Sequence, residues 1–107
     1  MTTIIDLEPI IEAVRKKFLQ PKDFLKGTSK YKFSKMPRQV AYYLAHKKFG
    51  HKNAHKGYSY VIEMEYLTGR NPTTILRGVK RLKVEMAKSP LLTRQVNELQ
   101  KELKIYE

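Results

Sequence analysis

From Asn71 to Leu103 the apolar side chains recur every three or four residues, the spacing of one face of an α-helix. The segment contains two such runs. Each begins with a capping residue followed by a proline, first at Asn71-Pro72 and then at Ser89-Pro90. Nowhere in the chain do two matched alternating segments offer partner strands for a sheet. The pattern therefore predicts an all-α fold.

Three earlier segments also carry helix signals. Asp6 and Ser59 can act as N-caps, and Pro37 can occupy a first helical position. The expected helices cover residues 6–18, 37–49 and 59–67. With the two later runs and one short turn, this makes five or six helices. A chain of 107 residues usually forms one domain, so residues 1–107 are expected to form a single domain.

Two connections precede the helix that starts at Pro37. Residues 20–27 predict one short helical turn that places Phe24 and Leu25 beneath the first helix. Residues 28–36 then interleave lysines with two aromatic side chains. Because no partner strand is evident, we interpret this second stretch as an extended basic loop.

The charge distribution indicates a polyanionic partner. The formal net charge is +12, from 22 Lys and Arg against 10 Asp and Glu. Residues 15–56 hold 13 of the basic residues and a single acid, Asp23. The commonest intracellular polyanions are nucleic acids. A basic surface that serves only solubility is the alternative.

Composition also excludes several classes of protein. The chain has no cysteine, which excludes disulfides and zinc–thiolate sites. No apolar run approaches the ~20 residues of a membrane span, and the first residues have no basic region or cleavable apolar stretch, so we expect no secretory signal. His51 and His55 are interpreted as solvated loop histidines rather than metal ligands. No nucleophile–base arrangement is evident, so we expect no enzyme, metal or cofactor, and a cytoplasmic, nucleoid-associated location.

Residues 59–83 have the layout of a helix-turn-helix, with two helices joined by a tight turn that contains Gly69. In that motif the second helix enters the DNA major groove and presents its N-terminal residues to the bases. Thr73 and Thr74 would be those residues. A threonine offers a hydroxyl group to bases or phosphate and a methyl group to thymine. The alternative is an ordinary first helical turn.

Four motifs resemble one family in the correct order. They are IIEAVRKKFLQPKDFLKG, MPRQVAYYLAHK, TGRNPTTILRGVKRL and SPLLTRQVNELQKEL. They are similar to the C-terminal DNA-binding domain (domain IV) of the bacterial replication initiator DnaA. The resemblance covers nearly the whole chain. It implies a helical domain of the Trp-repressor/DnaA type, with a helix-turn-helix and a basic loop, that binds double-stranded DNA.

The resemblance also implies a set of DNA-binding residues. Lys30 falls at or near the position of an arginine that enters the minor groove in that family. Arg38 and Gln39 match its phosphate-binding pair, while Arg70 and the two threonines match the signature that binds phosphates or bases. Four further residues are included because they lie next to these positions in the sequence: Lys32, Lys35, Asn71 and Arg77. The expected DNA-binding residues are Lys30, Lys32, Lys35, Arg38, Gln39, Arg70, Asn71, Thr73, Thr74 and Arg77.

Two departures from the family matter for function. Asn71-Pro72 stands where the family has aspartate and histidine, and proline cannot make a side-chain hydrogen bond to a base. A shifted or relaxed sequence preference is therefore expected. The chain also lacks a G-x-x-x-x-G-K-[ST] phosphate-binding loop, so we expect no ATPase activity.

The sequence thus favours a sequence-specific double-stranded DNA-binding protein. Its role would be that of an accessory factor or regulator in replication or transcription, of phage, plasmid or chromosomal origin. An interaction module that binds an acidic replication or transcription protein is the main alternative. A structured-RNA binder is a weaker one, because the A-form major groove is too narrow for a helix tip.

Overall fold

The computed structural model describes residues 6–22, 24–26, 32–49 and 60–105. The five helices are α1 (Glu8–Lys17), α2 (Lys32–Phe49), α3 (Tyr60–Thr68), α4 (Pro72–Lys88) and α5 (Pro90–Glu102). The described ranges contain no strand. The predicted all-α class with five to six helices is therefore confirmed.

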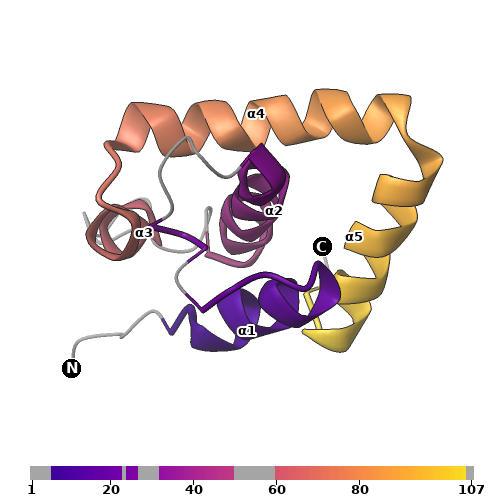
Figure 1. The fold of residues 1–107 in the computed structure, drawn as a ribbon, viewed down its shortest axis with the longest axis horizontal. Helices are drawn as coiled ribbons and strands as arrows, with labels where there is room; N and C mark the ends of the chain where they lie inside the picture. Colours follow the sequence, from indigo (N-terminus) through magenta and orange to yellow (C-terminus); the bar gives the residue numbers. More distant parts are fainter. Residues whose placement is uncertain (1–5, 23, 27–31, 50–59, 106–107) are drawn as a thin grey trace.

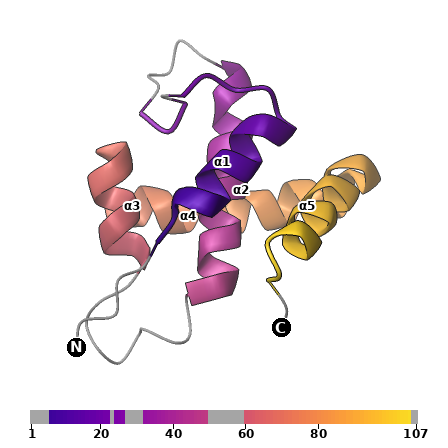
Figure 2. The same cartoon turned by 90° about the horizontal axis from the view of Figure 1, so that it is seen from below.

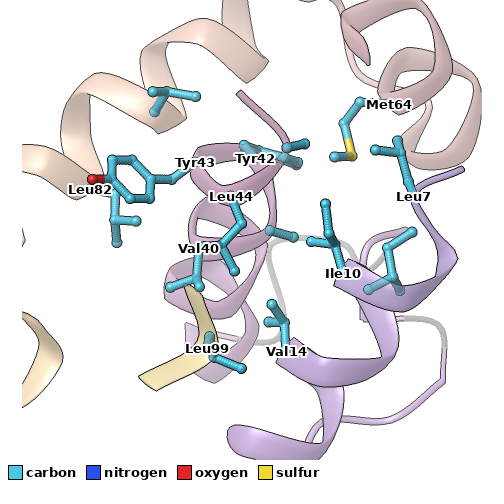
Figure 3. Packing of buried hydrophobic residues seen from close by; sticks show 14 of the residues in the cluster. Leu7, Ile10, Val14, Val40, Tyr42, Tyr43, Leu44, Met64, Leu82 and Leu99 are labelled. Carbon is cyan, nitrogen blue, oxygen red and sulfur yellow. The ribbon is translucent and has the colours of Figure 1, made fainter. Parts of the chain in front are cut away.

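Helix α2 lies at the centre of the molecule. It packs most extensively against α4 on one side and against α1 on the other (Figures 1 and 2). Val40, Ala41, Leu44 and Ala45 of α2 are completely buried. The remaining helices each contribute side chains to the same core (Figure 3), among them Ile10, Val14, Met64, Leu82 and Leu99. All five helices therefore share one apolar core.

The start of α2 differs from the prediction. The helix begins at Lys32, so residues 32–36 are helical rather than part of an extended loop, and Pro37 lies inside the helix. A proline removes one backbone hydrogen bond but does not prevent a helical turn before it. Met36 packs against the core, which favours the added turn. Residues 28–31 lie outside the described ranges.

Side-chain caps fix the starts of α4 and α5. The Leu92 amide donates to Ser89 Oγ at 3.2 Å, and Asn71 caps α4 in the same way. These two predicted caps are confirmed, because each side chain accepts a bond from an otherwise unpaired amide. The predicted cap at Asp6 is wrong: the N-cap of α1 is Leu7, and Asp6 Oδ1 accepts from the Glu8 amide at 3.1 Å one residue before it. Ser59 lies outside the described ranges.

The segment between α1 and α2 forms a turn instead of the predicted short helix. The Phe24 amide donates to the Pro21 carbonyl at 3.2 Å. Phe24 and Leu25 are both buried, as predicted. With these two side chains anchored in the core, the Leu25 carbonyl is held within reach of Arg70, just before α4.

Helix α1 lies on the side of α2 away from α4, and α5 runs from the end of α4 toward α1 (Figure 1). Lys17 Nζ of α1 lies 2.9 Å from Glu98 Oε1 of α5, and Ile105 is buried just after α5. No helix in the described part of the chain is long and apolar enough to cross a membrane.

Candidate nucleic-acid interface

Helices α3 and α4 are joined by three residues and cross steeply (Figures 1 and 2). Gly69 has φ +72°, a left-handed conformation that favours glycine, and its amide donates to the Glu65 carbonyl at 2.8 Å. The Thr68 hydroxyl donates to the Met64 carbonyl at 2.7 Å and accepts from the Arg70 amide at 3.1 Å. This turn fixes the direction in which α4 leaves α3.

Asn71 organises the first turn of α4. Its Oδ1 accepts from the Thr74 amide at 2.9 Å and from the Thr74 hydroxyl at 3.1 Å. Pro72 follows in the first helical position, where its missing amide hydrogen is harmless. Asn71, Thr73 and Thr74 are all exposed, so this end of the helix projects into solvent.

An open groove of about 600 Å³ lies between α2 and the first half of α4. We call it the α2–α4 groove. The groove is lined by Lys35, Arg38, Gln39, Tyr42, Arg70, Thr74, Arg77, Gly78 and Arg81. None of these described lining residues is acidic, and five of them are basic.

The groove brings together much of the predicted DNA-binding set. Six members line it, namely Lys35, Arg38, Gln39, Arg70, Thr74 and Arg77. Asn71 and Thr73 lie at the exposed start of α4. Lys30 is outside the described ranges, and Lys32 is the first residue of α2 but its side chain is not described.

Arg38 and Arg70 are tied to the turn that precedes α2. Arg70 Nη1 donates to the Leu25 carbonyl at 2.7 Å, and Arg38 Nη1 donates to the Phe24 carbonyl at 3.4 Å. Arg38 is only 7% exposed. Burial lowers the pKa of Arg38, and the nearby positive charge of Arg70 lowers it further. Both arginines therefore have a structural role in addition to any role in binding.

The outer cations of the groove differ from this pair. Lys35, Arg77 and Arg81 are exposed. Arg81 Nη2 lies 3.3 Å from Glu85 Oε1, one turn further along α4. Such an exposed pair contributes little to stability. These side chains can therefore change partners at small cost when an anion approaches.

Three lining residues, Tyr42, Gly78 and Arg81, were not among the predicted binding residues. Tyr42 is buried. A Cβ atom on Gly78 would lie 2.7 Å from Tyr42 Cδ2, so the ring occupies the space that the glycine leaves. The absence of acids from residues 66–84 was the available signal for Arg81. The Tyr42–Gly78 contact joins two helices and has no local sequence signal.

His51 and His55 lie outside the described ranges. No protein-family model matches this chain, and no curated protein matches its sequence.

Proposed function

We propose that this protein binds double-stranded DNA as a helix-turn-helix domain of the DnaA domain IV type. The observation that supports this most is the α2–α4 groove. Cationic side chains from two helices and from the turn between α3 and α4 line it, none of its lining residues is acidic, and it opens beside the exposed first turn of α4. A polyanion with a regular backbone has the complementary charge.

In this proposal the two parts of the surface have different tasks. The tip of α4, with Asn71, Thr73 and Thr74, enters the major groove and contacts base edges. The groove cations hold the phosphates beside it, which positions the helix but carries no sequence information. The role would be that of an accessory factor or regulator in replication or transcription.

The first test is selection from a random duplex library at near-physiological salt, followed by sequencing of the retained DNA. An enriched motif supports a sequence-specific reader. Retention without enrichment indicates a non-specific polyanion binder. No retention at all rejects DNA binding. Thr73→Ala serves as the variant in the same experiment, because an unchanged motif would reject α4 as the recognition helix.

A second candidate function is a module that binds an acidic protein. The outer face of α3 favours it, because Ile62 is 46% exposed and Tyr66 is 84% exposed. Exposed apolar side chains suit the centre of a protein interface, and the net charge of +12 suits an acidic partner. A competition experiment distinguishes the two functions. A short DNA duplex displaces a bound acidic protein only if the protein and the duplex bind overlapping surfaces.

A further inference from the structure

Tyr42 occupies the floor of the α2–α4 groove in a tightly fixed position. Its ring packs against Gly78 of α4, where an added Cβ would lie 2.7 Å from Cδ2 and 3.4 Å from Gln39 Cγ. The residue is 3% exposed. The phenol ring therefore has little freedom to turn, and the position of its hydroxyl is determined by the packing of two helices.

The Tyr42 hydroxyl is buried, and no hydrogen-bond partner for it exists among the described residues. Burial raises the pKa of this hydroxyl, while the positive charges of Arg70 and Arg38 act in the opposite direction. Burying a hydroxyl without a partner is unfavourable. A phenylalanine would fill the same space without that penalty. The unpaired hydroxyl therefore indicates that a ligand accepts a hydrogen bond from it.

The surroundings restrict what that ligand is. The hydroxyl lies near two guanidinium groups, in a groove whose described lining includes no acid. A phosphodiester brings a negative charge and oxygen atoms that only accept hydrogen bonds, which suits both a phenol donor and two cations. Lys35, Arg77 and Arg81 at the outer edge are exposed and can move aside as it enters.

We propose that the Tyr42 hydroxyl donates a hydrogen bond to a backbone phosphate of DNA, bound in the α2–α4 groove beside Arg38 and Arg70. The inference rests on the proposed function, because it requires a duplex in that groove. The Tyr42 hydroxyl would be a neutral donor among lysine and arginine side chains that are positively charged. Because its removal changes no charge, its effect on binding can be distinguished from theirs by the salt dependence of affinity.

The test compares wild type with Tyr42→Phe, using Tyr43→Phe as the matched control. Tyr43 is a buried tyrosine of the same helix that does not line the groove. Duplex affinity is measured by fluorescence anisotropy over a range of salt. For Tyr42→Phe we expect about a threefold to tenfold loss of affinity for every duplex, as for one hydrogen bond. The slope of log affinity against log salt stays unchanged, because no charge is removed.

A second measurement locates the phosphate. One phosphate at a time is replaced by an uncharged methylphosphonate along the duplex. At one position wild type should lose more affinity than Tyr42→Phe does, because the variant already lacks the hydrogen bond there. The melting temperature of Tyr42→Phe without DNA should equal or exceed that of wild type.

Each outcome decides one of the two proposals. Binding by Tyr42→Phe as tight as wild type overturns the inference, as does an equal loss in Tyr43→Phe. Failure of wild type to bind any duplex rejects the proposed function itself. If Tyr42→Phe does not fold, 3-fluorotyrosine placed at position 42 keeps the hydroxyl, and a 19F signal that does not shift on adding duplex also overturns the inference.

Discussion

The bonds of Asn71 determine what Thr74 can offer to a ligand. A backbone amide can only donate, so the Asn71 side-chain atom that pairs with the Thr74 amide must be the oxygen. The Thr74 hydroxyl, 3.1 Å from the same oxygen, must then donate to it. Toward DNA, Thr74 is left with acceptor lone pairs and a methyl group. These suit the amino groups of adenine and cytosine, and the thymine methyl group.

Thr74→Val tests this polarity directly, because valine keeps the shape and loses the hydroxyl. We expect the variant to lose preference at one base position while its affinity for unrelated duplexes changes little. The measurement is library selection with both proteins. An unchanged preference of Thr74→Val at every base position would contradict the assignment, because valine offers no acceptor there.

Asn71→Ala removes the cap of α4. The free energy of unfolding should fall by about 0.5–2 kcal/mol, because the Thr74 amide loses its partner. Asn71→Asp keeps an acceptor there and should retain stability, yet its negative charge should weaken duplex binding. Chemical denaturation and a binding titration measure the two effects. Equal stability of the alanine variant and wild type would show that solvent replaces the cap.

At the scale of helices, Arg70 joins three elements: the turn at Leu25, the end of α3 and the start of α4. Arg70→Ala should lower the free energy of unfolding by about 1–3 kcal/mol, because the Leu25 carbonyl loses its donor. Arg77→Ala should leave stability nearly unchanged, since Arg77 is exposed. It should instead lower duplex affinity and reduce the salt slope by about one. Denaturation curves and salt titrations distinguish the two arginines, and identical behaviour would contradict this division.

The close approach of α2 and α4 makes a helix-favouring substitution harmful. Alanine is about 1 kcal/mol better than glycine within a helix. At position 78, however, the new Cβ would lie 2.7 Å from the Tyr42 ring. We expect Gly78→Ala to be destabilising by about 1–3 kcal/mol through overpacking. Adding Tyr42→Leu should recover part of the loss. A gain in melting temperature from Gly78→Ala alone would show that the ring can move.

Features that depend on residues close together in the sequence were predicted, and features that depend on residues far apart in the sequence were not. The caps at Asn71 and Ser89 depend on residues three positions apart, and both were predicted. The predicted start of α2 at Pro37 was wrong. The helix begins at Lys32, where packing of Met36 against the core favours an added turn before the proline. The burial of Arg38 depends on a carbonyl fourteen residues away, which no local pattern contains. The groove likewise arises only when α2 and α4 meet.

At the scale of the whole molecule, an excess of positive charge is carried on a small body. The net charge is +12, and the described chain measures 39 × 30 × 22 Å. If the three exposed groove cations each contact one phosphate, these contacts should give a slope of log affinity against log salt of about −2.7. Affinity should then fall about 40-fold between 50 and 200 mM salt. A salt-independent affinity would contradict an electrostatic mode of binding.

The position of the ends of α1 and α5 has a practical consequence. Both helices end on the far side of α2 from α4, where Lys17 and Glu98 pair (Figure 1). A fluorophore, a biotin tether or a second polypeptide attached near either of these helix ends would sit away from α4. Under the proposed function, immobilised or fused forms of the protein should therefore bind duplex DNA as well as the free protein does.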